Sequence, residues 1–258
     1  MERLYQYVAV ELNEDWCKSK PPYFEIAEAM NRRQRYKLED VMAKGVESGE
    51  ITPEEAAYMQ AYTVIGKNGV MSMNCPEIPV RFSATDPVSY SKAVIFGRRM
   101  MHNIADYLIR HLPGFEHAFI SREAAMLGAR ESWRIRGKVY LTEADYHNQS
   151  RFVDAVCRTA WFIDAHGEKV SEKLPKGGFY EIPYRSLVTD EIKNLIVAGR
   201  SISASFILQA SMRIQPTCMS IGEAAGIAAA WGIAHNINPN DIKWENLPQN
   251  ERSYVSAG

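Results

Sequence analysis

The sequence lacks several features that would assign a chain quickly to a class. Its 258 residues carry a formal net charge of only −1, so bulk electrostatics recruit neither nucleic acid nor an anionic membrane. The four cysteines stand far apart without a CxxC pair, which disfavours a disulfide framework. The six histidines are scattered as well. We therefore expect no structural metal site.

Long apolar runs are also missing. No stretch approaches the roughly 18 consecutive apolar residues of a membrane span, so we expect no membrane partner. The opening residues, MERLYQYVAVELNEDWC, have no basic segment followed by an apolar run and do not resemble a secretory signal. We therefore expect a cytoplasmic protein. Hydrophobic residues make up 46% of the chain, enough for a sizeable core.

Caps and periodicity predict several helices. Residues 38–49 are typical of a short helix that ends at a glycine, and Thr52-Pro53-Glu54-Glu55 is typical of another helix start. The clearest helix spans 87–112, with Asp86 as its cap and Pro113-Gly114 as its stop. Its expected buried stripe consists of Tyr90, Val94, Gly97, Met101, Ile104 and Leu108.

Two kinds of strand are expected. Apolar alternation around Lys67-Asn68-Gly69 predicts a hairpin within 61–82. Residues 132–141 alternate from Trp133 to Leu141, as in an antiparallel strand with one buried face. The short apolar run 195–198 is typical of a strand buried on both faces of a parallel sheet.

The segment 194–230, NLIVAGRSISASFILQASMRIQPTCMSIGEAAGIAAA, is the most informative part of the chain. It predicts a strand, a glycine turn, a Ser-rich loop, and a helix from Pro216 to about His235. Free N–H groups of Thr217, Cys218 and Met219 would point out of the helix start, where the helix dipole favours negative charge. Such a start suits a phosphate or the N1/C2=O edge of a flavin. An ordinary strand–helix unit with surface arginines explains the pattern at least as well.

Small residues mark one face of that helix. Gly222, Ala225, Gly226 and Ala229 recur at helical spacing. Residues of this size would let the helix backbone lie very close to a sheet. The glycines do not form a dinucleotide-binding loop, because they lie inside the helix.

Several motifs follow one another in a familiar order. They are ATDPVSYSKAVIFGRRM, LPGF, LGARESWRIRG and YLTEADY, then Ile163-Asp164-Ala165-His166, IPYR, NLxVAGR and MRxxPTCMxxGxAAGxAAA. In this order the chain resembles the C-terminal part of the bacterial FAD-dependent oxidoreductase family, flavoproteins with a two-dinucleotide-binding-domain fold. The resemblance covers about residues 68–236. Trp133 departs from it, because the family pattern leads us to expect an arginine there.

The resemblance implies FAD as cofactor and a small polar organic molecule as substrate. Gly199 and Arg200 would face the ribityl–pyrophosphate region of FAD, and the helix start would meet the C2=O of its ring. The other cofactor-binding positions implied are Ser203, Met212, Arg213, Pro216, Thr217, Cys218 and Met219. Cys218 also admits an interpretation as a nucleophile, but a small residue beside the flavin is the simpler one.

The catalytic candidates implied are His166, Tyr184 and Arg185. A histidine of near-neutral pKa would take a hydroxyl or amine proton while hydride passes to the flavin. Tyr184 and Arg185 would orient the substrate. A surface histidine in a Gly-flanked turn is the alternative for His166. Arg130, Glu131 and Arg134 would line the substrate cavity, or else form a solvated ion-pair ladder.

The GxGxxG motif that normally cradles the FAD pyrophosphate does not occur in the sequence. A second polypeptide with that motif, a longer parent protein, or loss of flavin binding would each account for this. The first is our interpretation: one subunit of a split, flavin-dependent enzyme. The alternative is a non-catalytic subunit that stabilises a flavoprotein complex.

The expected fold class is α/β (α+β): the C-terminal portion of a Rossmann-like FAD-binding domain plus a substrate domain with an antiparallel sheet. The expected boundaries give 1–84 as a helical and hairpin part of the substrate domain, 85–185 as the substrate domain, and 186–258 as the FAD-binding portion.

Overall fold

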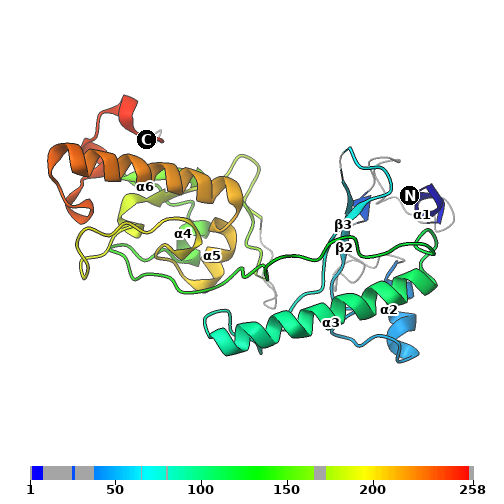
Figure 1. Ribbon diagram of the computed structural model, residues 1–258. Helices are drawn as coiled ribbons and strands as arrows, with labels where there is room; N and C mark the ends of the chain where they lie inside the picture. The colour runs from blue at the N-terminus through cyan, green and yellow to red at the C-terminus, as the bar shows by residue number, and fades with distance from the viewer. Residues whose placement is uncertain are drawn as a thin grey trace. The chain divides into compact units, whose positions relative to one another are not determined.

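A computed structural model describes residues 2–7, 25–26, 38–64, 66–79, 81–165 and 173–255. The chain forms two compact units, Met1–Gly128 and Ala129–Gly258 (Figure 1). The units differ from the three segments 1–84, 85–185 and 186–258, because side chains from 141 to 188 share one core with side chains from 202 to 247. As functional parts, those three segments stay a prediction.

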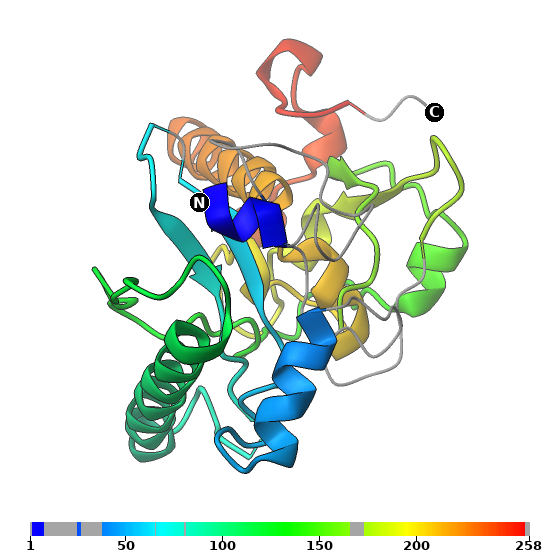
Figure 2. The same ribbon diagram turned by 90° about the vertical axis from the view of Figure 1, so that its right-hand side faces the viewer.

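Helices α1 (Glu2–Tyr5), α2 (Leu38–Glu47) and α3 (Pro87–His111) belong to the first unit. The predicted cap is confirmed: the Asp86 carboxylate accepts from the Ser89 N–H at 2.6 Å. Helix α2 packs beside the C-terminal half of α3 (Figure 2). Of the expected stripe of α3, Ile104 and Leu108 are buried and the other four members are half-buried. The neighbouring residues Ala93, Met100 and Tyr107 are buried in addition.

The first unit also contains a small antiparallel sheet in the order β1-β2-β3, formed by Glu25–Ile26, Gln60–Thr63 and Met71–Asn74. The predicted hairpin is confirmed, and Gly69 takes the left-handed φ of 77° that its turn requires. Thr52 and Glu55 make reciprocal capping contacts at 2.7 and 3.2 Å. No helix follows them, because the chain turns directly into β2.

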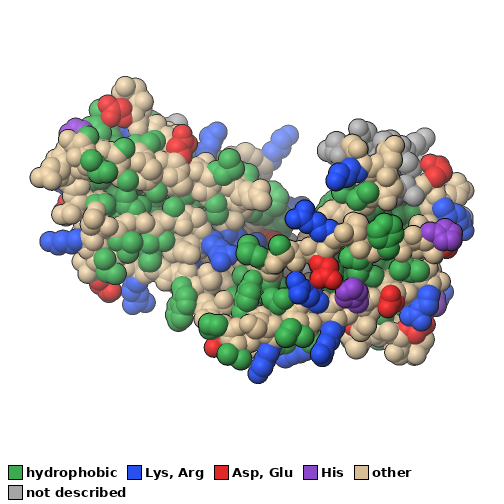
Figure 3. Space-filling model, viewed as in Figure 1, with side chains coloured by type: hydrophobic (Ala, Val, Ile, Leu, Met, Phe, Trp, Pro, Cys, Tyr) green, Lys and Arg blue, Asp and Glu red, His purple; other side chains and the backbone are tan. Residues whose placement is uncertain are grey.

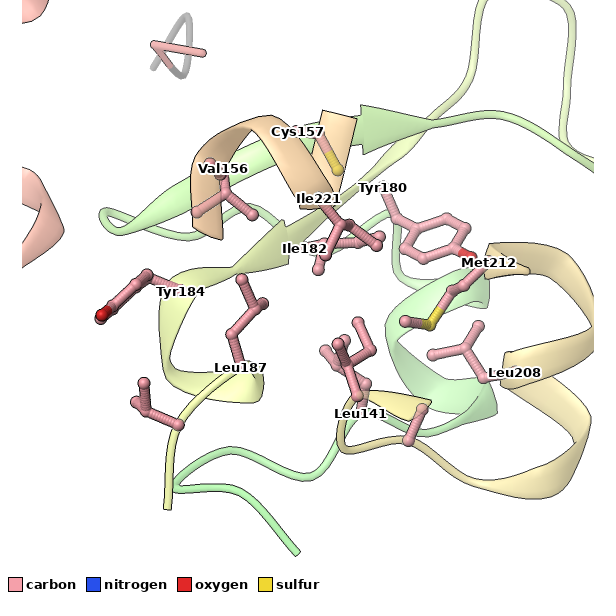
Figure 4. Close-up of a cluster of buried hydrophobic side chains, with 14 of the residues drawn as sticks. Leu141, Val156, Cys157, Tyr180, Ile182, Tyr184, Leu187, Leu208, Met212 and Ile221 are labelled. Carbon is pink, nitrogen blue, oxygen red and sulfur yellow. The ribbon is translucent and has the colours of Figure 1, made fainter. Parts of the chain in front are cut away.

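The second unit packs helices against a two-stranded antiparallel sheet of β4 (Ala155–Thr159) and β5 (Tyr180–Pro183). The helices of this unit are α4 (Glu143–His147), α5 (Phe206–Met212) and α6 (Gln215–His235), with 3-10 turns at 184–186, 199–201, 239–241, 244–246 and 249–251. Figure 4 shows side chains of β4, β5, α5 and α6 meeting in one core. This mixture of helices and small antiparallel sheets is an α+β architecture.

Two predicted strands are not strands in the structure. Within 132–141, Ile135 and Leu141 donate to Ser201 and Ser203, while Val139 donates to Arg185. The segment therefore splits its bonds between two other segments instead of forming a ladder. Its inward alternation holds from Ile135 to Leu141, but Trp133 is 77% exposed.

In the run 195–198, the Val197 N–H donates to the Leu187 carbonyl at 2.8 Å. A strand inside a parallel sheet is hydrogen-bonded to neighbouring strands, and among the described residues no strand pairs with this run. The Rossmann-like part of the expected fold therefore stays a prediction.

Helix α6 buries one face and exposes the other. Its buried side chains include Ile221, Ala224 and Ala228, whereas Gly222, Gly226 and Ala229 are exposed. The expected close packing of the glycine face onto a sheet is therefore absent within the described residues: a Cβ at Gly222 or Gly226 would meet no atom within 4 Å.

Helix α6 is also long and apolar enough to cross a membrane, so the expectation that no segment has this property was wrong. One such helix is weak evidence for a span, because core helices pass the same test.

Candidate functional site

The start of α6 is held in place by the helix before it. Ser205 caps α5, accepting from the Leu208 N–H at 3.1 Å, and its hydroxyl donates to Glu143 at 2.9 Å. Arg213 ends α5, and Pro216 stands in the first turn of α6, where its missing N–H costs nothing. The two helices therefore fix the segment 212–218 between them.

The first turn of α6 differs from the expected one in a detail that matters for binding. The helix begins at Gln215, so the Cys218 N–H donates to the Ile214 carbonyl at 2.9 Å. The Cys218 N–H is therefore not free for a ligand. Among the described residues, the Thr217 N–H has no such backbone partner. The donor set at this helix start is smaller than the sequence indicated.

A carboxylate joins two of the predicted arginines. The Asp164 side chain lies 3.1 Å from the Arg213 guanidinium and 3.5 Å from that of Arg130. Arg213 also donates to the Asp164 carbonyl at 3.0 Å. Burial, followed by the neighbouring Arg130, lowers the pKa of Arg213. Two cations around one anion leave this cluster with a net positive charge.

A third arginine lies beside this cluster. The Arg200 guanidinium donates to the Ala129 carbonyl, and the Gln209 amide donates to the Arg130 and Arg200 carbonyls at 3.1 and 3.5 Å. Gly199 takes a φ of 70°, and nothing lies within 4 Å of where its Cβ would be. Residues 129–130 and 199–200 are therefore tied together through α5.

The Cys218 thiol lies near these charges but is not activated by them. Burial raises the pKa of Cys218, and this effect outweighs the opposing effects of Arg200 and Arg213. A raised pKa keeps the group a thiol at neutral pH, and the thiolate is the nucleophilic form. The structure thus favours the simpler interpretation, a small residue at a helix start.

Three of the predicted cofactor residues have little or no exposed surface. Ser203 is 0% exposed, and Met212 and Thr217 are also buried. The Thr217 hydroxyl contacts that of Thr159 on β4 at 3.1 Å. Direct contact of these side chains with a cofactor is therefore not available in the structure. The exposed or half-buried members are Gly199, Arg200, Arg213, Pro216, Cys218 and Met219.

Tyr184 and Arg185 have other partners than the arginine cluster. The Tyr184 hydroxyl donates to the Pro239 carbonyl at 2.7 Å, and its buried ring stacks on Trp244. Arg185 pairs with Asp154 at 2.9 and 3.0 Å. A substrate-orienting role for Tyr184 is not available while its hydroxyl is buried and engaged. Arg185 acts as a structural partner of a buried carboxylate.

The remaining candidates divide in a similar way. Arg134 pairs with Glu131 and donates to the Ala204 carbonyl at 3.0 Å. These contacts are closer to the ion-pair alternative than to a role in the substrate cavity. Arg130 belongs to the Asp164 cluster. His166 lies outside the described residues.

Three residues of this region were not singled out as site residues from the sequence: Asp164, Gln209 and Thr159. Asp164 stands two positions before His166 in a quoted family motif, which was a usable signal. Gln209 and Thr159 gave none, because their roles depend on which loops meet. Among the described residues, no three His, Cys, Asp or Glu side chains are grouped to hold a metal.

Comparison with known proteins gives one match. Residues 5–250 fit the family described as FAD dependent oxidoreductase. No curated protein and no solved structure matches the chain.

Proposed function

Because the chain belongs to the family of FAD-dependent oxidoreductases, which indicates a flavin-linked redox role, we propose that it is one subunit of a split enzyme. In this proposal it completes the FAD site and forms the substrate cavity, while a second polypeptide supplies the GxGxxG half. Hydride would pass between a small polar organic substrate and FAD.

The exposed face of α6 carries this proposal. Gly222 and Gly226 have open space where a Cβ would stand, and Ile233 on the same helix is 85% exposed. In Figure 3 hydrophobic side chains lie along this helix. An exposed apolar helix face of small residues is typical of an interface that a partner backbone approaches closely.

The exposed members of the predicted cofactor set fit a flavin. Arg200 and Arg213 bring positive charge to Cys218 at the helix start, and together with the helix dipole this charge suits an electron-rich ring edge or a phosphate. FAD, when bound, accepts or returns the hydride. The chain's own part is to orient that ring and to exclude water from it.

Two further roles belong to the proposal. Asp164 holds Arg213 and Arg130 in place, so it is a positioning residue for the helix start. His166 follows it by two positions and is the proposed acid/base, which holds the proton that leaves the substrate.

The test is flavin retention. The chain is purified alone and together with a candidate partner of about 150–200 residues that carries a strand–GxGxxG–helix. We expect flavin absorbance, at roughly 450 nm, only in the joint preparation. Flavin bound by the chain alone would contradict the split site, and a stable complex without flavin would favour the stabilising subunit.

Charge variants refine the same test. Arg200→Gln should reduce flavin retention in the complex, because it removes a cation beside the helix start. Lys193→Gln removes the same charge from an exposed position of the preceding segment and should leave retention unchanged. Equal retention in both variants would remove Arg200 from the site.

A further inference from the structure

The second unit contains an open cavity that the proposed cofactor residues do not line. It has a volume of about 500 Å³, within the range typical of small-molecule sites. Its walls come from the end of β4 and from the turn before β5, and they include Arg158, Thr159, Leu174, Gly177, Gly178 and Phe179. A Cβ at Gly177 would meet no atom within 4 Å, so the wall is open at this glycine.

Arg158 is the charged residue of this wall, and it is exposed. Its guanidinium lies 5.0 Å from the centre of the Phe179 ring and makes no hydrogen bond or ion pair with any residue that the structure describes. Its cross-strand neighbour, Glu181, is fully buried and accepts from the Phe152 N–H and the Tyr254 hydroxyl. The five donors of Arg158 are therefore available to a ligand.

A second arginine near Phe179 is already engaged. Arg151 lies 3.6 Å from the centre of the ring and donates to the Gln149 and Phe179 carbonyls. It therefore fixes the ring, while Arg158 stays open. Among the described residues that line the cavity, none is acidic. One free guanidinium beside an aromatic and an aliphatic wall matches a small anion with an apolar body.

The cavity also adjoins the start of α6. Thr159 lines it, and the Thr159 hydroxyl contacts that of Thr217 at 3.1 Å. Thr217 stands in the first turn of the helix whose start is the proposed flavin contact. A ligand in the cavity would therefore lie one residue away from the proposed cofactor site.

We propose that this cavity binds the carboxylate of a small organic acid, with Arg158 as its bidentate partner and the apolar wall against the body of the acid. The guanidinium fork matches the two oxygens of a carboxylate, which a point charge would not distinguish from other anions. The assignment of this acid as the enzyme's substrate rests on the proposed function; the binding itself does not.

Binding is measured by titrating the full chain, without flavin, with benzoate and with its neutral counterpart benzamide. We expect saturable benzoate binding and at least about tenfold weaker benzamide binding. Arg158→Gln should weaken benzoate about tenfold or more, and Arg158→Lys should recover only part of the loss.

The matched control is Lys176→Gln, which removes one positive charge from the same turn at a position outside the cavity wall. It should change the benzoate affinity less than about twofold, because an exposed lysine outside the wall offers the carboxylate no guanidinium fork. A circular dichroism spectrum shows that each variant is folded. Unchanged affinity in Arg158→Gln, or no saturable benzoate binding by the folded wild-type chain, would overturn the proposal.

The two proposals fail separately. Arg158-dependent benzoate binding without flavin in any complex would leave the cavity assigned and reject the flavin subunit. Flavin retention in the complex without benzoate binding would support the flavin subunit and reject the cavity as a carboxylate site.

Discussion

Helices α3 and α6 are both long, but they expose different kinds of side chain to solvent. Along α3 several exposed side chains are charged and paired: Arg98 and His102 meet Glu123 at 3.1 and 2.9 Å, and Arg110 and His111 meet Glu50 at 3.2 and 3.0 Å. Val88 and Ile95 are apolar exceptions on the same helix. Along α6 the exposed residues are mainly Gly, Ala and Ile, with Glu223 as the only acidic residue of the helix.

The difference shows which of the two helices has a surface suited to water without further cover. A surface helix normally presents a polar face to water, whereas a helix that is apolar all round is normally covered on all sides. Helix α3 meets the first description and α6 the second. The exposed apolar face of α6 is therefore the part of the surface that supports the proposed partner, whereas the charged face of α3 is suited to solvent.

The largest effect should separate the two faces of α6. Ile221 is 0% exposed and Ile233 is 85% exposed. Ile221→Ala should lower the free energy of unfolding by about 2–5 kcal/mol, since it leaves a cavity in the core. Ile233→Ala should change it by less than about 0.5 kcal/mol in the chain alone. Urea unfolding measures both, and equal losses would show that the outer face is covered within the chain.

The next effect should appear only with a partner. Gly226→Leu points a side chain into open space, so the chain alone should fold normally. Its affinity for the dinucleotide-binding chain should fall about tenfold or more, because a close backbone approach is blocked. Lys92→Leu on the exposed face of α3 is the control and should leave that affinity unchanged. A dissociation constant unaffected by Gly226→Leu would remove α6 from the interface.

A smaller effect distinguishes two glycines of α6. Gly226→Ala should stabilise the chain alone by about 1 kcal/mol, because alanine is the better helix former and its methyl meets nothing. Gly232→Ala should destabilise it, since the new Cβ would lie 2.8 Å from the Ile237 carbonyl oxygen. Thermal unfolding of the two variants measures the signs. The same sign for both would contradict the open face.

The smallest effect is a pH dependence that belongs to α3 alone. The contact with His111, its largest cause, lowers the pKa of Glu50 below the ordinary 4.5. A carboxylate with a lowered pKa stabilises the fold above its unfolded pKa, and this contribution is lost as pH falls through the folded value. Glu50→Gln should therefore flatten the acid side of the stability profile slightly. A profile identical to that of the wild type would show that the contact contributes nothing.

Local structure was predictable where it depends on neighbours in sequence. The cap at Asp86 and the turn at Gly69 follow from local chemistry, and the structure has both. The helix expected from Pro216 begins one residue earlier, at Gln215. The expected strand at 195–198 failed for the opposite reason. Its apolar pattern matches a parallel strand, but a strand forms only with a hydrogen-bonded neighbour, which no pattern within four residues specifies.

The sequence pointed to residues that lie together in the structure, but that they bind a flavin stays a prediction. The sequence led to the segment around Arg200 and Arg213, and the structure places both beside Cys218. Burial of Ser203, Met212 and Tyr184 could not be predicted, because each depends on how distant loops pack. The partnership of Asp164 with two arginines is non-local in the same sense.

The packing around Ser211 gives the protein an optical reporter. The Tyr180 hydroxyl donates to Ser211 Oγ at 2.8 Å, and Ser211 donates to the Trp161 carbonyl at 2.7 Å, so the backbone at Trp161 is fixed to α5. The Trp161 indole is partly exposed and stacks on Phe162. Trp161 directly follows Ala160, which lines the cavity. Indole emission depends on contact with water. Filling of the cavity should therefore be visible as a change in intrinsic fluorescence, without a label.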